Sequence, residues 1–257
     1  MSYIESLFSL SSMVIVVTGA ARGNGLAMSE SFLKAGATVV MVDVLDELSH
    51  VCDRLRNEGR AACYLQCDVT KDDELDSLIN FVKQEHGQLD VLVNNAGVTF
   101  GHSLLDYPDE LWEATYRVNL RAPYQLCKRV APIMIKQGHG TIINITSINA
   151  ELAFPDNPAY ISFKGGLKQL TKSLALDLGK YGIRVNNIMP GYFRTEMTAK
   201  SWADPEKNQA RSEKTMLGRW GQPEDLAGLA ILLASPASAY ITGQDFCIDG
   251  GWTSKGL

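Results

Sequence analysis

MVIVVTGAARGNG, at residues 13–25, joins a short apolar run to a glycine-rich turn. The run MVIVVTG (13–19) is apolar without alternation, which is typical of a strand buried on both faces of a parallel sheet. Gly19, Gly23 and Gly25 form the turn, and an amphipathic stretch follows at 24–36. Glycines at such a junction let the backbone approach a pyrophosphate at the positive end of the next helix. The stretch therefore predicts a strand, a turn and a helix that bind a dinucleotide.

The residues around this turn bear on the choice of dinucleotide. Arg22 and Asn24 lie inside the turn, and no Gly-Lys-Ser/Thr follows, so a P-loop for nucleoside triphosphates is not expected. Asp43 ends the second apolar run, 24 residues after Gly19. A carboxylate there accepts hydrogen bonds from both adenosine ribose hydroxyls and repels a 2′-phosphate. Arg22 could attract that phosphate, but Val44 adds no second basic group, so the sequence favours NAD over NADP. The alternative for Asp43 is a solvated carboxylate at a strand end.

Apolar runs alternate with amphipathic stretches along the whole chain. The strand candidates are 13–19, 38–43, 61–67, 89–95, 140–146, 183–189 and 244–249. The helix candidates are 24–36, 46–58, 71–86, 108–137, 158–181 and 223–234. This alternation implies right-handed crossovers, and no break in composition marks a second domain. We therefore expect a single α/β domain over residues 1–257, with a Rossmann-like, doubly wound, seven-stranded and mainly parallel sheet covered by helices on both faces.

Two stretches interrupt this pattern. Pro132, inside the helix candidate 108–137, predicts a kink or an early end of that helix. Residues 191–222 are polar with scattered aromatic side chains. A segment of that length within a compact domain is typical of a lid over a substrate. A surface excursion with one or two short helices is the alternative.

Composition narrows the class of protein. The 257 residues carry a net charge of −5, which gives no basic footprint for nucleic acid. The five cysteines are odd in number and scattered, and Cys63 and Cys67 have no histidine at zinc spacing, so reduced thiols and no metal site are expected. The first residues, MSYIESLFSLSS, lack the charged start of a signal peptide, and no apolar run suits a membrane span. We expect a cytoplasmic protein.

Tyr160 and Lys164 carry the clearest chemical signal. Positions four apart share one face of a helix, so an ammonium lies near a phenol. A nearby cation lowers the pKa of a tyrosine from about 10, which suits proton exchange with an alcohol or ketone oxygen. A second pair of this spacing, Tyr124 and Lys128, has Leu111 where Ser147 precedes the first pair. We interpret that second pair as structural.

Taken together, the motifs of the chain are similar to those of the short-chain dehydrogenase/reductase family. They follow the family's order and spacing over nearly the whole sequence. The matching segments are TGAARGNG (18–25), CDVT (67–70), NNAG (94–97), Asn119 in RVNL, Ser147, YISFK (160–164), PGYFRT (190–195) and IDGGW (248–252). Asn24 departs from the pattern, because the family more often has isoleucine or leucine there; its backbone N–H can still face the pyrophosphate.

The resemblance implies a role for each matched residue. Tyr160 is expected to be the general acid/base, with Lys164 lowering its pKa and binding the nicotinamide ribose. Ser147 is expected to hold the substrate oxygen, and Asn119 to support a water in the proton relay. The remaining cofactor contacts implied by the resemblance are Gly19, Arg22, Asn24, Gly25, Asp43, Asp68, Val69, Asn95, Ala96, Gly97, Pro190, Gly191 and Thr195.

The substrate is less constrained by sequence. SINAELAF, PGYFRTEMT and RWGQPEDL resemble gluconate 5-dehydrogenase-like and other sugar or polyol dehydrogenases. Asn149 and Glu151 could bond to substrate hydroxyls, and Arg194, with Arg211 and Lys214, could meet a carboxylate, although each charge is also typical of a solvated surface. We expect oxidation of a secondary hydroxyl on a sugar, sugar acid or polyol. The alternatives are a 3-oxoacyl-[acyl-carrier-protein] reductase and a non-catalytic dinucleotide sensor.

The resemblance also implies a homotetramer. The helices predicted at 108–137 and 158–181 are the expected contact surfaces, with the apolar segment near Trp252 contributing elsewhere.

Overall fold

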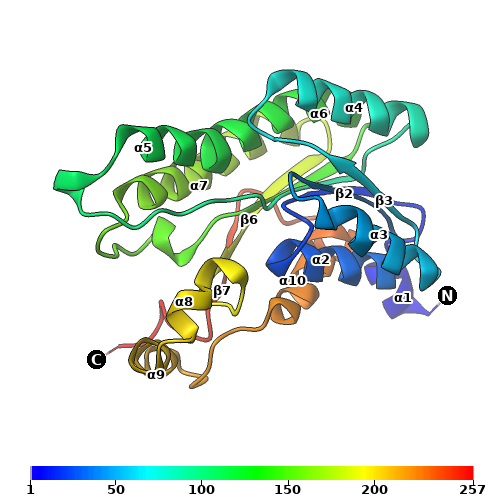
Figure 1. Cartoon of the computed structure of the whole chain (residues 1–257). Helices are drawn as coiled ribbons and strands as arrows, with labels where there is room; N and C mark the ends of the chain where they lie inside the picture. Colours follow the sequence, from blue (N-terminus) through cyan, green and yellow to red (C-terminus); the bar gives the residue numbers. More distant parts are fainter. Residues whose placement is uncertain (1, 257) are drawn as a thin grey trace.

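A seven-stranded sheet lies at the centre of the computed structural model, which describes residues 2–256 (Figure 1). The strand order is β3-β2-β1-β4-β5-β6-β7, and every pairing is parallel. The strands are β1 (Val14–Thr18), β2 (Thr38–Asp43), β3 (Ala62–Gln66), β4 (Val91–Asn94), β5 (Gly140–Ile145), β6 (Ile183–Pro190) and β7 (Asp245–Ile248). All seven predicted strands are confirmed to within two residues at each end. Strands β1, β4 and β5 are buried along their whole length, as their unbroken apolar runs predict.

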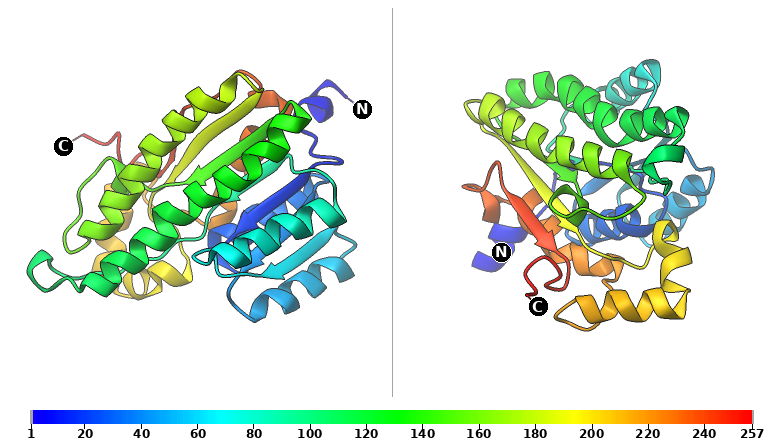
Figure 2. Two further views of the ribbon diagram at one scale, coloured as in Figure 1. Left: turned by 90° about the horizontal axis from the view of Figure 1, so that it is seen from above. Right: turned by 90° about the vertical axis from the view of Figure 1, so that its left-hand side faces the viewer.

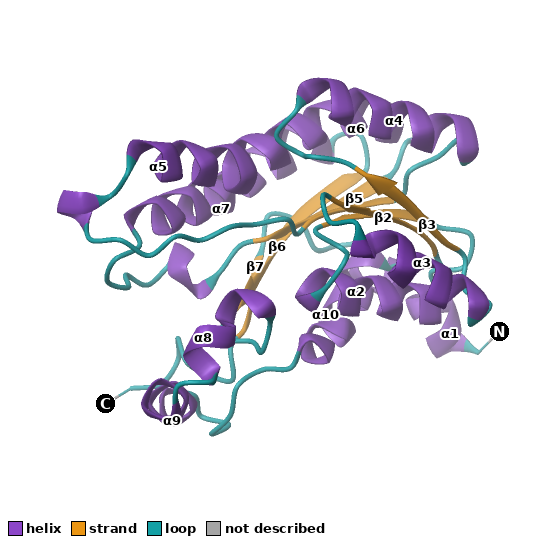
Figure 3. Cartoon of the chain, in the orientation of Figure 1, coloured by secondary structure: helices purple, strands orange, loops and turns teal. Residues whose placement is uncertain are grey.

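Helices cover both faces of the sheet, as predicted (Figures 1 and 3). The longer helices are α2 (Gly23–Lys34), α3 (Glu47–Asn57), α4 (Asp72–Glu85), α5 (Asp109–Tyr116), α6 (Ala122–Gln137), α7 (Pro158–Gly179), α9 (Pro205–Lys214) and α10 (Ala227–Ala234). The short helices α1 (Tyr3–Phe8) and α8 (Ala199–Trp202) were not predicted as separate elements. One apolar core joins α2, α3 and α10 to the sheet, and a second joins α4, α6 and α7 to the opposite face. Seen from above, α4, α6 and α7 lie side by side over the strands (Figure 2).

The connection between α5 and α6 differs from the prediction of one helix over 108–137. A π-helical turn, Arg117–Arg121, joins the two helices and contains Asn119. The early end suggested by Pro132 was wrong, because α6 continues to Gln137. Pro132 lies on the exposed side of α6, where the carbonyl that loses its partner can face water, while Val130 and Met134 pack in the core. Burial of that apolar face keeps the helix intact.

The 191–222 segment contains α8 and α9 and is tied to the sheet at both ends. Phe193 and Gly221 form a parallel bridge, and Gly221 N–H donates to the Tyr192 carbonyl at 2.9 Å. Met216 N–H donates to the Gly250 carbonyl at 2.8 Å. Trp220 is 2% exposed and anchors the end of the segment. Helices α8 and α9 are therefore held beside the carboxyl ends of β6 and β7 (Figure 1).

Two further sequence expectations concern cysteines and membrane spans. All five cysteines are free thiols, and Cys52, Cys67 and Cys127 are buried. Within residues 2–256, no helix combines the length and apolar character that crossing a membrane requires.

Candidate active site

The turn between β1 and α2 is built from glycines that leave no room for side chains. Gly19 has a φ of +65°, and a Cβ there would lie 2.9 Å from the Ala96 Cα. A Cβ on Gly25 would lie 2.0 Å from the Gly19 carbonyl oxygen. The Asn95 side chain closes the turn, since its Nδ2 donates to the carbonyls of Thr18 and Gly19 at 2.9 and 3.0 Å. The first N–H groups of α2 remain available to an anion.

Asp43 lies beside this turn, where β2 ends. Its Oδ2 accepts the Ala21 N–H at 3.0 Å, and its Oδ1 accepts the Val44 N–H at 2.8 Å. The carboxylate therefore braces the glycine turn and still has lone pairs for ribose hydroxyls. Arg22 precedes α2 with an exposed side chain. The Asn24 Oδ1 is buried without a hydrogen-bond partner, so the residue that departs from the family pattern also has an unsatisfied acceptor.

The other predicted cofactor residues lie on neighbouring loops. Asp68 Oδ1 accepts two bonds from Thr70, which fixes the loop after β3, and Val69 is 7% exposed. Pro190 ends β6, and Gly191 passes so close to β7 that a Cβ would lie 2.8 Å from the Asp249 Cα. Thr195 lies near the first turn, with its Cγ2 3.3 Å from the Cβ position of Gly23. These loops all follow the carboxyl ends of strands, where parallel sheets bind ligands.

Asn119 holds the loop after β4 in place. Its Nδ2 donates to the Val98 carbonyl at 2.8 Å, and its Oδ1 accepts the Val98 N–H at 2.9 Å. The residue is fully buried, and the π-helical turn directs it at this loop. Next to it, a Cβ on Gly97 would lie 3.4 Å from the Asn119 Oδ1 and 3.6 Å from the Lys164 Nζ. Asn119, Gly97 and Lys164 are therefore brought together, as predicted.

Ser147 follows β5 and begins a short 3₁₀ turn, Ile148–Ala150. Its Oγ accepts the Asn149 N–H at 3.1 Å and donates to the Asn149 Oδ1 at 3.3 Å. The hydroxyl also lies near enough to the Tyr160 phenol to lower the pKa of that group. The serine is 8% exposed, so its hydroxyl is held in place yet open on one side.

Tyr160 and Lys164 lie on α7, one turn apart. The Lys164 Nζ is 5.6 Å from the centre of the Tyr160 ring and donates to the Ile145 carbonyl at 2.7 Å. Lys164 is 3% exposed, and its burial lowers the pKa of the ammonium from 10.5 to about 8. The predicted pairing of the two side chains is therefore present. Tyr124 and Lys128, the second pair of this spacing, lie exposed on the outer face of α6.

The predicted lowering of the Tyr160 pKa is not found. Burial of the phenol raises its pKa, the Ser147 hydroxyl opposes that rise, and the neighbouring Tyr192 adds to it. Burial is the largest of these effects, and Lys164, whose ammonium donates to the Ile145 carbonyl, does not contribute to the shift. In this arrangement the surroundings of Tyr160 favour the neutral phenol over the phenolate.

Comparisons with known proteins place this site in a family. A family model described as enoyl-(acyl carrier protein) reductase matches residues 19–253, a range that includes Ser147, Tyr160 and Lys164. The chain belongs to the short-chain dehydrogenase/reductase family. It is therefore an oxidoreductase with a dinucleotide site.

Three relatives of this dehydrogenase/reductase are informative. Gluconate 5-dehydrogenase of Gluconobacter oxydans is 38% identical, over 96% of this chain and 97% of the relative. The 7α-hydroxysteroid dehydrogenase of Escherichia coli K12 is also 38% identical, over 92% of each chain. A crystal structure of a gluconate 5-dehydrogenase from Burkholderia cenocepacia, in complex with NADP and tartrate, is 36% identical with a TM-score of 0.95, covering 99% of this chain and 100% of that one.

The candidate substrate residues have different surroundings in the dehydrogenase/reductase structure. Glu151 forms a short ion pair with Lys168, which lies one turn after Lys164 and is itself 3.7 Å from Asp245. Asn149 is bound to Ser147, as described above. Arg194 is exposed, and its guanidinium lies 5.4 Å from the centre of the Trp202 ring. Asn149 is thus held against Ser147, Glu151 is paired with Lys168, and Arg194 stacks on Trp202 at the surface of the 191–222 segment.

Sequence reasoning missed an aromatic wall beside Tyr160. Tyr192 lies 5.0 Å from Trp252 and 6.1 Å from Phe154 between ring centres. Phe154 belongs to the loop that joins Ser147 to α7, and Trp252 follows β7. The three residues come from loops far apart in sequence, so no local pattern reveals the cluster. The signal available in the sequence was that each of the three residues follows a strand, β5, β6 or β7, at the same edge of the sheet.

Proposed function

We propose that the chain interconverts a secondary alcohol and a ketone on a sugar acid, with Tyr160 as the general acid/base. Sugars and polyols are the neighbouring substrate classes. The observation that carries the proposal is the convergence of Ser147, Tyr160 and Lys164 at one strand end, beside a glycine turn suited to a dinucleotide. The gluconate 5-dehydrogenase relative, 38% identical over 96% of the chain, supports the substrate class.

The proposed roles follow from the contacts. When bound, the dinucleotide supplies the hydride acceptor or donor. Gly19, Gly25 and the start of α2 would hold its pyrophosphate, and Gly97 and Lys164, which lie together, would line its cleft. Ser147 would bond to the substrate oxygen, and Tyr160 would exchange the proton with that oxygen. Lys164 would bind the nicotinamide ribose, and Asn119 keeps the loop after β4 rigid through both of its bonds to Val98.

The side chains around Ser147 support a polyhydroxylated substrate. Asn149 offers an amide within the same turn, and Glu151 offers a carboxylate that forms an ion pair with Lys168. Such groups satisfy substrate hydroxyls and leave unpaired polar atoms when a substrate lacks them. This arrangement favours a sugar acid over the apolar substrate named for the steroid dehydrogenase relative.

We propose NAD as the preferred cofactor. The Asp43 carboxylate lies at the end of β2 beside the glycine turn, and a 2′-phosphate bound there would meet a like charge. Two observations point the other way: the exposed Arg22 could pair with a phosphate, and the Burkholderia cenocepacia relative is in complex with NADP. The preference therefore depends on Asp43 outweighing Arg22.

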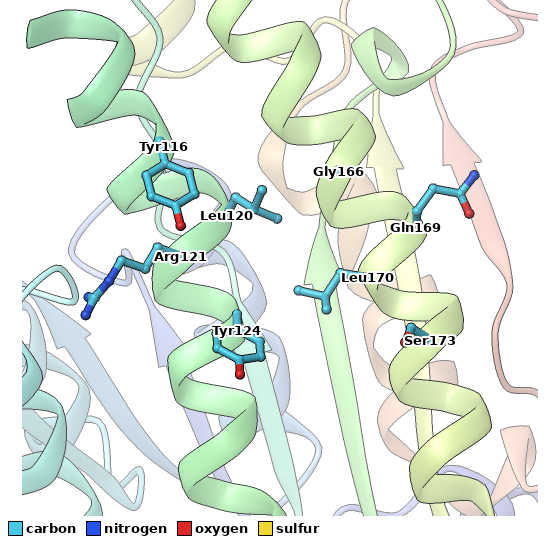
Figure 4. A pocket seen from close by; sticks show the side chains of 8 residues that line it. All are labelled: Tyr116, Leu120, Arg121, Tyr124, Gly166, Gln169, Leu170 and Ser173. Carbon is cyan, nitrogen blue, oxygen red and sulfur yellow. The ribbon is translucent and has the colours of Figure 1, made fainter.

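We further propose a cytoplasmic homotetramer. The five free thiols suit a reducing compartment. A groove of about 450 Å³ runs between α5–α6 and α7 on the outer face of the molecule (Figure 4). Its lining includes both apolar and polar residues. The groove lies on the helices that we expect to make contacts between subunits. The lining residues are Tyr116, Leu120, Arg121, Tyr124, Gly166, Gln169, Leu170 and Ser173.

A substrate and cofactor panel tests the proposed reaction. D-gluconate, 5-keto-D-gluconate, sorbitol and acetoacetyl thioesters are assayed with NAD(H) and NADP(H) by absorbance of the reduced nicotinamide. Turnover of the aldonate and its ketone is expected, and Tyr160→Phe should reduce it at least 100-fold while still binding cofactor. Turnover of the thioesters alone would instead favour the 3-oxoacyl-[acyl-carrier-protein] reductase. Full activity in Tyr160→Phe would show that the assigned acid/base is wrong.

A further inference from the structure

Arg211, on α9, stacks its guanidinium on two aromatic rings. The Cζ lies 4.6 Å from the centre of the Tyr192 ring and 5.8 Å from that of Trp220. Trp220 is 2% exposed and donates its indole N–H to the Asn208 carbonyl at 3.3 Å, so it is a rigid support. Stacking holds the plane of the guanidinium in one orientation and lowers the entropy lost when it binds a ligand.

This guanidinium lacks the partner that a partly buried charge normally has. Within residues 2–256, no carboxylate forms an ion pair with Arg211, although the neighbouring arginine Arg219 pairs with Asp225 at 2.6 Å. The Arg211 Nη1 is buried and has no hydrogen-bond acceptor. A buried donor left unpaired is costly, and it marks a position that a ligand can satisfy. The planar fork of an arginine suits two parallel bonds to a carboxylate.

Arg211 is connected to the proposed reaction site through the Tyr192 ring. The Tyr192 ring, on which it stacks, lies close enough to Tyr160 to raise the pKa of that phenol. Tyr192 also contacts Phe154 from the loop that carries Ser147. The guanidinium and Phe154, from the loop after Ser147, therefore contact the same aromatic ring. A sugar acid likewise has several carbons between its carboxylate and the hydroxyl at its far end.

We propose that Arg211 binds the carboxylate of the substrate and so selects sugar acids over neutral sugars and polyols. This inference rests on the proposed function, because it identifies the group that distinguishes an acid at the same site. Arg194 and Lys214, the other cations of the 191–222 segment considered for this role, are exposed. Only Arg211 combines a fixed plane, a buried unpaired donor and contact with the aromatic wall of the active site.

The test compares two substrates that differ in one group. D-gluconate has a carboxylate where sorbitol has a hydroxymethyl group. Arg211→Met keeps an unbranched apolar stem without the guanidinium, and Arg211→Lys keeps the charge without the fork. For D-gluconate, kcat/KM should fall about 100-fold in Arg211→Met and about 10-fold in Arg211→Lys. The KM for cofactor and the activity toward sorbitol should change less than about 3-fold.

The matched control is Lys207→Met, which removes a charge from the same helix. It should leave every constant unchanged, since Lys207 pairs with Asp204 on the surface.

Binding is measured separately from turnover. D-gluconate is titrated calorimetrically into Tyr160→Phe enzyme with bound cofactor, with and without Arg211→Met, and circular dichroism verifies the fold of each variant. Loss of D-gluconate binding in the double variant supports the inference. Equal losses for D-gluconate and sorbitol, or a raised KM for cofactor, would show a structural or cofactor role and overturn it. If wild type oxidises D-gluconate and Arg211→Met does so equally well, only the inference fails; if wild type neither binds nor oxidises any sugar acid, the proposed function fails with it.

Discussion

At the scale of single residues, Lys164 couples the site to pH. It is 3% exposed, and burial lowers the pKa of its ammonium from 10.5 to about 8. Between these two values the unfolded chain holds more protons than the folded protein, so the free energy of unfolding increases with pH. We predict that this residue contributes an increase of roughly 1.5 kcal/mol between pH 8 and 9.5. Urea denaturation of the cofactor-free enzyme at fixed protein concentration measures it.

The control for this prediction is Lys164→Met. The buried thiols of Cys67 and Cys127, with pKa values raised to about 12, and the raised pKa of Tyr160 act in the opposite direction at high pH. Those groups are present in both proteins. Their contributions therefore cancel when the free energy of unfolding of the variant is subtracted from that of wild type at each pH. A difference that stays flat from pH 8 to 9.5 would contradict the lowered pKa of Lys164.

Asp43 gives a second prediction at this scale. Asp43→Asn removes the charge that repels a 2′-phosphate and keeps an oxygen that can accept the Ala21 N–H. The ratio of kcat/KM for NADP to that for NAD should rise at least 10-fold, with Arg22 then free to pair with the phosphate. Asp46→Asn, a neighbouring exposed carboxylate, is the matched control and should leave the ratio unchanged. An unchanged ratio in Asp43→Asn would mean that another group sets the preference.

At the scale of elements, a chain of buried polar side chains links α7 to the centre of the sheet. The Asn94 Nδ2 donates to the Asn144 Oδ1 at 2.7 Å, joining β4 to β5. The Thr171 hydroxyl accepts from the Asn144 Nδ2 at 2.8 Å and donates to the Asn187 Oδ1 at 2.7 Å, joining α7 to β5 and β6. The Asn187 Nδ2 donates in turn to Asp245 on β7 at 2.7 Å. These hydrogen-bonded side chains therefore hold α7, which carries Tyr160 and Lys164, in position against the sheet.

We therefore predict that Thr171→Val, which preserves the shape of the side chain, lowers the free energy of unfolding by roughly 1–3 kcal/mol. The loss arises because two buried amides are left without their partner. Thr171→Ser keeps the hydroxyl and should recover most of the stability, apart from one methyl group. Equilibrium denaturation distinguishes the two variants, and equal losses in both would mean that packing, and not the hydrogen bonds, is responsible.

How far the sequence predicts these elements depends on whether the signal is local. Short segments centred on apolar residues located all seven strands, and the glycine turn located the start of α2. The early end predicted from Pro132 was wrong, because burial of one face of α6 stabilises the helix more than a proline on the exposed face destabilises it. The π-helical turn at Asn119 has no local signature. The pKa of Tyr160 and the unpaired guanidinium of Arg211 depend on which atoms tertiary packing brings together, such as the Ile145 carbonyl and the Tyr192 ring.

At the scale of the whole molecule, the outer surface of α5–α6 and α7 forms a continuous face. Leu170 lies in the groove between these helices (Figure 4), and Leu176, two turns further along α7, is 82% exposed. Residues three or seven apart share one side of a helix, so Leu176 lies on the same side of α7 as Ser173 and Gln169, which line the groove. A large apolar side chain that is exposed next to an open groove is typical of a contact between subunits.

We predict that wild type sediments as a tetramer and that Leu170→Glu shifts it to smaller species, because a carboxylate in a buried contact is desolvated without a partner. Ser77→Glu on α4 adds the same charge to an exposed position away from the groove and should leave the tetramer intact. Sedimentation velocity over a range of concentrations measures both variants. A wild-type monomer, or a Leu170→Glu protein as large as wild type, would contradict the proposed contact. Dissociated Leu170→Glu that still binds cofactor would show that the dinucleotide site is complete within one subunit, as the position of its glycine turn and Asp43 within a single chain implies.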